Sequence, residues 1–283
     1  ISGNVNADES IGTRITVKKM YNSEGNVLPF VSARAIKYAI RQTLEARGYK
    51  IDPFIKEGQQ LNDSGNPKEY IDNDLFGYMS TQRGGKKGEG KSFSRQAPIA
   101  LSYLKALYDT PVSTEFAARF PRDKNQKNPV PFEIEVVEFI GRLNSIIYDY
   151  IGKSEETEEQ SFILDENERK KRLKDFLEIF LSPTYVLPRR TNSLNIPEYL
   201  WGMIVLSLNG PKPIYQYLDY KMEGKEIKLN EDKLKYLKSI LGESDKFFLV
   251  NYGTNTPSGE FLKETKTVKV KEAVEEICNF YFS

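Results

Sequence analysis

The sequence contains no histidine and only one cysteine, Cys278, among its 283 residues. Without histidine the chain lacks the commonest general base and metal ligand, so Ser-His and Cys-His nucleophiles are excluded. A single cysteine excludes an internal disulfide and any zinc site built on several cysteines, and it fits a reducing cytoplasm. Cys278 shares the apolar helical pattern of Val274 and Ile277, so we expect a buried, unreactive thiol.

Long apolar runs are also missing. The most apolar stretch, residues 199–208, is too short to cross a bilayer, and no signal peptide is visible. We therefore expect a cytoplasmic protein that makes no use of a membrane. The 41 Lys and Arg residues nearly balance the 40 Asp and Glu residues, for a net charge of +1, so the overall charge does not indicate nucleic-acid binding.

The charge is unevenly distributed along the chain. Residues 14–50 and 83–95 are strongly basic, whereas residues 155–168 carry seven carboxylates and no Lys or Arg. A nearly neutral protein with one basic and one acidic part can bind a polyanion on one side. It can also stack on copies of itself.

Residues 31–41, VSARAIKYAIR, predict a helix that begins after Ser32 as its N-cap. Arg34, Lys37 and Arg41 follow at helical spacing and share one face. An apolar face lies beside it, formed by Ala33, Ile36, Ile40 and Leu44. Because a helix N-terminus favours anions, three cations along the adjoining face would make a track for a phosphodiester backbone. The alternative is an ordinary solvated face.

The remaining pattern is that of an α+β protein, because strands and helices do not alternate regularly. Strands are expected over residues 1–6, 13–20, 132–140 and 200–208, with turn residues 22–26 closing a hairpin and the last two strands largely buried. Helices are expected over residues 165–181, capped by Asp165, and over 229–241 and 271–281. This order is compatible with a four-stranded antiparallel sheet of the RNA-recognition-motif (RRM) or ferredoxin-like class. No aromatic RNP1 signature is present, so RNA binding would depend on phosphate contacts.

Four blocks occur in a characteristic order: ISGNVNADESIGTRITVKK (1–19), FVSARAIKYAIR (30–41), NDLFGYM (73–79) and RQAPIALSYLKAL (95–107). Together they resemble the backbone subunit of type I CRISPR Cascade complexes, most closely that of the type I-B branch. The resemblance is strong over residues 1 to about 110 and loose beyond. It implies a modified RRM-like palm made of residues 1–50 and 96–283, with a finger insertion at 51–95 and a possible thumb at 184–198.

The resemblance also implies a function. Such a subunit is not an enzyme and needs no cofactor. Several copies coat the CRISPR guide RNA as a helical filament and present it for pairing with target DNA, together with other Cascade subunits. Contacts to the RNA backbone position the strand, and base pairing supplies the sequence recognition.

The resemblance places specific residues at the RNA. Ser32 would donate to a phosphate, Arg34, Lys37 and Arg41 would follow successive phosphates, and Asn6 would lie beside the guide. Ala7 stands where the related type I-E pattern has an arginine, which weakens the case for that loop. The other basic candidates are Arg14, Lys18, Lys19, Arg83, Lys86, Lys87, Lys91, Arg189 and Arg190. The glycine-rich run 82–91 is not a P-loop, and it predicts either a loop that orders on RNA or a surface hairpin tip.

Two expectations concern single side chains of the basic helix. Tyr38 could stack on a base, but a core aromatic at the helix margin is the interpretation we favour. Because Arg34, Lys37 and Arg41 lie away from the apolar face, their joint replacement by alanine is expected to leave the thermal midpoint nearly unchanged.

Two other functions remain open. Asp8 with Glu9, or Asp72 with Asp74, could hold Mg²⁺ and activate water, which would make the chain a metal-dependent ribonuclease of a related CRISPR complex. Neighbouring acids in loops are also common as caps and turn formers, and that is the interpretation we favour. The other possibility is a stand-alone RNA-binding regulator, which copy number on one RNA would distinguish from a filament subunit.

Overall fold

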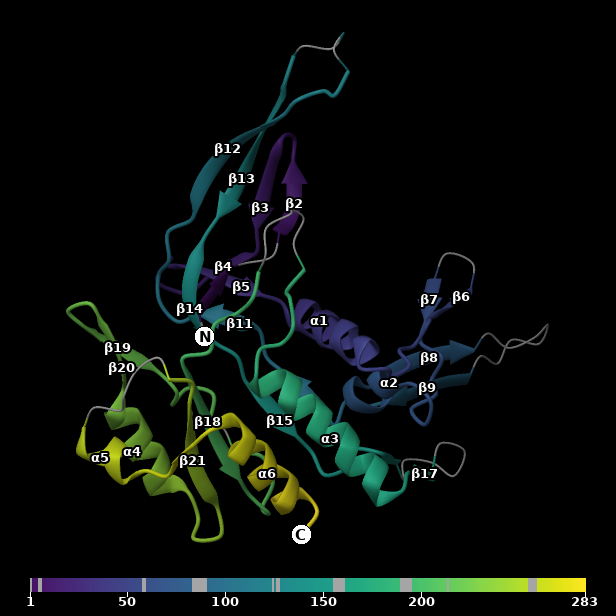
Figure 1. Ribbon diagram of the computed structural model, residues 1–283, viewed down its shortest axis with the longest axis vertical. Coiled ribbons are helices and arrows are strands. Elements are labelled where there is room, and N and C mark those ends of the chain that lie inside the picture. Colours follow the sequence, from purple (N-terminus) through teal and green to yellow (C-terminus); the bar gives the residue numbers. More distant parts are fainter. Residues whose placement is uncertain are drawn as a thin grey trace.

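The computed structural model of the chain describes residues 2–4, 7–57, 60–82, 91–123, 125, 128–154, 161–188, 195–212, 214–253 and 259–283. Its centre is a five-stranded antiparallel sheet in the order β1-β14-β11-β5-β4 (Figure 1). The strands are β1 (Ser2–Asn4), β4 (Lys19–Tyr21), β5 (Val27–Val31), β11 (Leu104–Ala106) and β14 (Glu138–Arg142). The mixture of helices and small sheets confirms the α+β class, although this sheet has one strand more than the four expected.

The basic helix forms as the sequence predicts. The 22–26 turn closes the β4–β5 hairpin, with the Gly25 N–H donating to the Asn22 carbonyl at 3.0 Å. Helix α1 (Ala33–Ala46) then begins directly after β5. Its apolar face is in the core, because the side chains of Ile36, Ile40 and Leu44 are completely buried. The helix ends before Gly48, whose φ of +91° is the left-handed conformation that glycine adopts most easily.

Two further helices complete the main core. Helix α3 (Glu166–Leu181) begins as expected at Asp165, whose carboxylate accepts the Glu168 N–H at 3.0 Å. Helix α6 (Val270–Tyr281) packs beside α3 (Figure 1). Cys278 lies half-buried on α6, and burial raises the pKa of its thiol, as expected for an unreactive cysteine. Short strands border this core: β10 (Ile99–Leu101), β15 (Ser145–Ile147), β16 (Lys153–Ser154) and β17 (Phe162–Ile163).

A long hairpin projects from one end of the molecule (Figure 1). It consists of β12 (Ser113–Arg119) and β13 (Val130–Val136), and we call it the arm. The arm continues into a second sheet, in the order β12-β13-β3-β2, through β3 (Arg14–Val17) and β2 (Ala7–Ile11). The expected buried strand over 132–140 is therefore wrong for its first half. Only Val137 and Phe139 reach the core, because β13 belongs to the arm and is partly exposed.

The predicted finger segment contains two hairpins that point away from the core (Figure 1). They are β6 (Ile55–Glu57) with β7 (Gln60–Asn62), and β8 (Tyr78–Gln82) with β9 (Lys91–Arg95). The short helix α2 (Ile71–Phe76) between them is instead buried in the main core. The segment thus combines projecting hairpins with one core element, and the finger boundary at 51–95 stays a prediction.

The last third of the chain forms a smaller layer with its own apolar cluster. Strand β18 (Trp201–Leu206) pairs antiparallel with β21 (Lys246–Asn251), which pairs parallel with β22 (Thr267–Val268). The expected strand at 200–208 and helices at 229–241 and 271–281 are confirmed, although the middle of β18 is only half-buried. The other elements here are β19 (Tyr220–Glu223), β20 (Glu226–Leu229), α4 (Glu231–Ile240) and α5 (Glu260–Glu264).

The described residues bear only partly on two further expectations, the thumb and the lack of a membrane-spanning segment. In the possible thumb, 184–198, the side chains of Tyr185 and Leu187 are buried, whereas residues 189–194 lie outside the described residues. The thumb therefore stays a prediction. None of the helices in the described ranges combines the length and the hydropathy that a bilayer-spanning segment requires.

Candidate nucleic-acid interface

The candidate site begins where β5 passes into α1. The Ser32 side chain accepts the Ala35 N–H at 3.3 Å, which caps the helix as predicted. The first N–H groups of a helix have no partner within it and point along the axis. No acidic residue lies in the first turn of α1 to neutralise them. This end of the helix is therefore electropositive.

The outer face of α1 carries the three predicted cations in distinct environments. Arg34 is exposed, whereas the Lys37 ammonium and the Arg41 guanidinium both lie over the Phe76 ring of α2, each 5.2 Å from its centroid. Burial lowers the pKa of Lys37, and the neighbouring Arg41 cation lowers it further. Two cations held side by side in partial burial gain free energy from an added anion.

Arg41 also has a structural role that the sequence did not reveal. Its Nε donates to the Asp72 carboxylate at 2.9 Å, and the Asp72 side chain is only 2% exposed. The other Asp72 oxygen accepts the Asp52 N–H at 2.9 Å. Replacing Arg41 by alanine would leave this buried carboxylate poorly paired, at a cost of about 1–3 kcal/mol. Because of this contact, the triple alanine variant is now expected to have a lower thermal midpoint than the wild type, unlike the expectation from the sequence.

The Asp74 carboxylate is at the centre of a buried cluster behind this face. It accepts the Arg95 guanidinium at 2.8 Å, the Arg172 guanidinium at 2.9 Å and the Gly152 N–H at 3.0 Å, and its side chain is fully buried. The two arginines also donate to backbone carbonyls, those of Asp74, Lys153, Tyr150, Pro67 and Lys68. The cluster is a structural junction of four distant chain segments.

These contacts bear on the proposed metal sites. In α2 both Asp72 and Asp74 bind guanidinium groups, so their oxygen atoms are already engaged by cations. Asp8 and Glu9 lie on β2, but their side chains are outside the described part of the structure. Within that part, no three His, Cys, Asp or Glu side chains gather as metal ligands.

The basic residues before α1 have acidic neighbours on the arm. Arg14 pairs with Glu133 at 2.6 Å, and Lys19 pairs with Glu135 at 2.9 Å. Burial by itself would raise the pKa of Glu135, but Lys19 and the Val17 N–H hold it below its usual value. The lysine between them, Lys18, lies where β3 passes into β4, and its carbonyl accepts the Phe30 N–H at 3.0 Å. Their role as RNA contacts stays a prediction.

The other predicted RNA contacts lie outside the described residues. These are Asn6, Arg83, Lys86, Lys87, Arg189 and Arg190. Lys91 opens β9, but nothing of its side chain is described. The structure therefore brings together the α1 cations and leaves these candidates as predictions.

Two aromatic residues of the site differ from the sequence analysis. Tyr38 is 52% exposed, so the core interpretation is wrong: its position on α1 is about 200° around the helix from the buried Ile36. Phe76, which supports Lys37 and Arg41, was not identified. The available signal was the spacing of Asp72 and Phe76, which fits one helical face, but the segment was interpreted as a turn.

The helix cap allows a direct test of this end of α1. We expect Ser32→Ala to lower the free energy of unfolding by about 1 kcal/mol, because the Ala35 N–H loses its acceptor. Ser32→Asp should keep the cap but place a negative charge where a phosphate would bind. Thermal denaturation and RNA titration, measured on both variants, separate the two roles. Wild-type RNA affinity in Ser32→Asp would show that RNA does not approach this helix end.

Comparisons with known proteins agree with this picture. A family model described as the CRISPR-associated negative auto-regulator DevR/Csa2 matches residues 2–188. No curated protein matches the sequence. Among solved structures, a chain of a "CRISPR RNA-guided surveillance complex" is similar over 98% of both chains, at 12% identity and a TM-score of 0.53. A chain of a complex described as "pre-nicking" is similar over 97% of both chains, at 13% identity and a TM-score of 0.58. The matched family region spans about two thirds of the chain, which therefore belongs to the CRISPR-associated DevR/Csa2 family.

Proposed function

We propose that the chain is a guide-RNA-binding backbone subunit of a type I CRISPR surveillance complex, of the I-B kind. Several copies bind one guide RNA and leave its bases free to pair with target DNA. Family membership supports this proposal. The fold similarity to two surveillance-complex chains also supports it, because it extends over nearly the whole length of each chain. Other subunits of such a complex would then be its partners.

One observation contributes most to the proposal. Lys37 is a half-buried ammonium whose pKa is lowered by burial and by a neighbouring guanidinium, with no carboxylate among the causes. It lies one helical turn from the exposed Arg34 and beside the exposed Tyr38. Both are on helix α1, which is capped by Ser32 and has no acidic residue in its first turn. A polyanion with regularly spaced charges can pair with the cations on this face, and the Tyr38 ring can stack on a base.

The architecture supports the finer parts of the proposal. An antiparallel sheet backed by α1 is compatible with an RRM-like palm, and the hairpins at 51–95 with a finger. We propose a non-enzymatic role, since the Asp72 and Asp74 carboxylates are engaged by arginines. RNA that stays intact on the protein in Mg²⁺ would support this role. Cleavage that Asp8→Ala abolishes would contradict it.

A second candidate is a regulator that binds RNA as a single copy. The description of the matched family, a negative auto-regulator, favours this alternative. The two functions differ in how many copies bind one RNA, because a regulator has a fixed stoichiometry whereas a backbone subunit adds copies as the RNA lengthens.

RNA length therefore provides the test of the proposed function. We expect mass photometry to show particles that grow with RNA length, in steps of one 32.5 kDa protomer plus its share of RNA. The measurement uses single-stranded RNAs of increasing length and arbitrary sequence. The same stoichiometry on every RNA would support the regulator and contradict the filament subunit. Guide RNA that co-purifies after expression with a CRISPR array would add independent support.

A further inference from the structure

A large cavity lies between the main core and the C-terminal layer. Its volume is about 580 Å³, and its walls come from β15, α3, β18, α6 and the segment between β18 and β19. Well-packed protein interiors contain few voids larger than a water molecule, so this cavity is not an ordinary packing defect. Its volume is typical of sites that enclose a small organic molecule.

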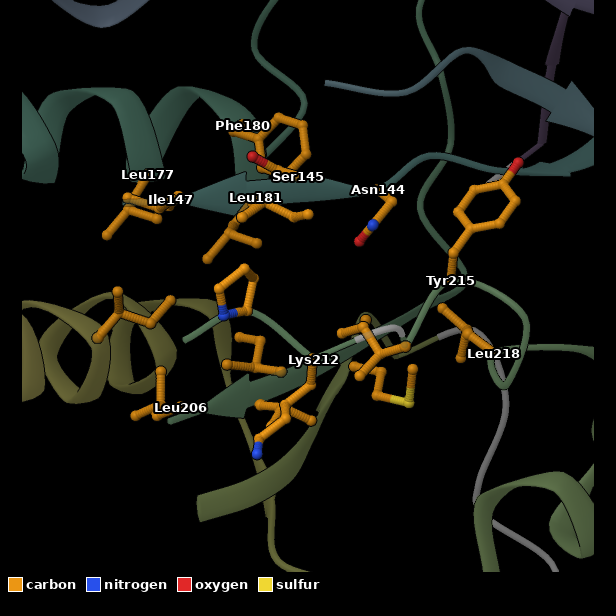
Figure 2. A pocket seen from close by; sticks show the side chains of 18 of the residues that line it. Asn144, Ser145, Ile147, Leu177, Phe180, Leu181, Leu206, Lys212, Tyr215 and Leu218 are labelled. Atoms are coloured by element: carbon orange, nitrogen blue, oxygen red, sulfur yellow. The ribbon is translucent and has the colours of Figure 1, made fainter. Parts of the chain in front are cut away.

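One part of the cavity has aliphatic walls. Figure 2 shows Ile147, Leu177 and Leu181 on one side and Leu206 on the other. The apolar side chains in the middle of β18, residues 203–205, also line the cavity and are only half-buried. Such side chains gain free energy when a hydrocarbon covers them. This part of the cavity is therefore suited to an alkyl chain.

The other part of the cavity is polar and positively charged. Figure 2 shows the Asn144 side chain directed into the cavity, with Tyr215 beyond it. Arg142, the last residue of β14, lines this part, and its guanidinium lies 4.7 Å from the centroid of the Tyr215 ring. The cavity thus combines an apolar part with a cationic end.

The positive charge at this end is not balanced. Lys105 on β11 lies directly opposite Arg142, both side chains are half-buried, and within the described residues neither forms an ion pair with a carboxylate. Like charges opposite each other on neighbouring strands are destabilising. The Arg142 Nε is also covered from solvent and has no hydrogen-bond acceptor. In contrast, Lys212, another cation of the lining, pairs with Asp245 at 3.3 Å.

These features define the chemistry of a ligand. A carboxylate beside Arg142 would balance the excess charge, and hydrogen bonds between a guanidinium and a carboxylate are among the strongest in proteins. An attached alkyl chain would cover the aliphatic walls. A nucleotide fits less well, because its polar base and sugar would meet aliphatic walls that offer them no hydrogen bonds.

We propose that the cavity binds an amphipathic anion, a medium-chain alkyl carboxylate. Its carboxylate lies beside Arg142 and Lys105, and its chain lies between β15, α3 and β18. None of the predicted RNA contacts within the described residues lines the cavity. The site is therefore separate from the face of α1, and the inference goes beyond the proposed function.

A series of ligands that differ only in chain length tests the proposal. Isothermal titration calorimetry with hexanoate, octanoate and decanoate, each below its micelle concentration, should show one ligand per chain. The affinity should rise roughly fourfold for each added CH₂, because each buried CH₂ contributes a constant free energy. Decanol has the same chain without the charge, and it should bind at least about tenfold more weakly than decanoate.

Three variants test the position of the ligand. Arg142→Gln should bind decanoate no better than decanol, and its unchanged affinity for decanol would show that the cavity is intact. Lys105→Gln should weaken decanoate severalfold and leave decanol unaffected. Asn144→Trp fills the polar part of the cavity and should bind neither ligand. A matched control, Met222→Trp, places the same side chain on the β19–β20 hairpin, where Met222 is 55% exposed, and should bind both ligands like the wild type.

Several results would overturn the proposal. These are a wild type that does not bind decanoate, an affinity that does not depend on chain length, and equal affinities for decanoate and decanol. Several ligands per chain would indicate adsorption to the surface. Decanoate binding that survives in Asn144→Trp would place the ligand elsewhere. A wild-type preference for decanoate in both Arg142→Gln and Lys105→Gln would show that these cations do not hold the carboxylate.

Discussion

Asp74→Ala should destabilise the protein more than loss of the Ser32 cap or of the Arg41–Asp72 ion pair. The variant leaves the guanidinium groups of Arg95 and Arg172 buried without their shared carboxylate. Their side chains are only 2% and 4% exposed, so water cannot replace the lost partner without opening the core. Removing one partner of a buried ion pair costs about 3–5 kcal/mol. Thermal denaturation should show a midpoint lower by roughly 10 °C.

An exposed ion pair provides the control for this prediction. Glu166 pairs with Lys170 on the surface of α3, and its side chain is 64% exposed. Glu166→Ala should leave the thermal midpoint nearly unchanged, because exposed pairs contribute little to stability. Equal midpoints for the two variants would mean that the Asp74 cluster is not closed in solution.

The second large effect concerns RNA binding. Replacing Arg34 and Lys37 by alanine should reduce the log–log salt slope of single-strand binding by about 1.4, or about 0.7 for each phosphate contact. Binding at low salt should weaken by at least about tenfold for each contact, and equally for all sequences. Arg41 is kept because it pairs with the buried Asp72. Fluorescence anisotropy titrations at several salt concentrations measure both quantities.

A charge-matched variant distinguishes this site from the overall charge. Lys225 and Lys263 are exposed and lie in the C-terminal part of the chain. Replacing both by alanine removes the same net charge but should leave the salt slope unchanged. If both double variants lose the same slope, RNA binding depends on total charge, and the face of α1 has no special role.

The lowered pKa of Lys37 adds a pH signature to this site. Only protonated Lys37 attracts a phosphate, and its pKa lies below the ordinary 10.5. As the pH rises through this lowered value, the free protein loses the proton and affinity should fall earlier than for an ordinary lysine. Lys37→Arg should remove this fall, because a guanidinium stays charged. An alkali-resistant 2′-O-methyl strand allows the measurement.

The predictions from the sequence succeeded where local signals were sufficient. Ser32 and Asp165 cap α1 and α3 as expected, because a cap and an apolar helical period are read within a few residues. Whether residues 132–140 form a buried or an exposed strand depends on elements that are distant in sequence. Its alternation fits a strand in any setting, and only its pairing with β12 and β3 moves its first half into the exposed arm.

The candidate site shows the same difference between local signals, which the sequence reveals, and long-range contacts, which it does not. The shared face of Arg34, Lys37 and Arg41 follows from spacing alone. That Arg41 is bound to Asp72, and that Asp74 joins Arg95 to Arg172, could not be inferred, because each contact closes a loop of 21 residues or more. Neighbouring carboxylates favour a turn or a cap and also allow a metal site, and only their cationic partners in the structure distinguish these roles.

The buried polar residues of α2 have a consequence for how the family can diverge. Asp52 accepts the Ser64 N–H at 2.8 Å and the Asn73 amide at 2.9 Å, which closes the base of the β6–β7 hairpin. Asp74 holds Arg95 at the base of the β8–β9 hairpin. Both hairpins are thus tied at their roots to one buried helical turn. Their tips can lengthen at a cost of only about 0.6 kcal/mol per doubling of the loop, so evolution can resize these projections without redesigning the body that carries them.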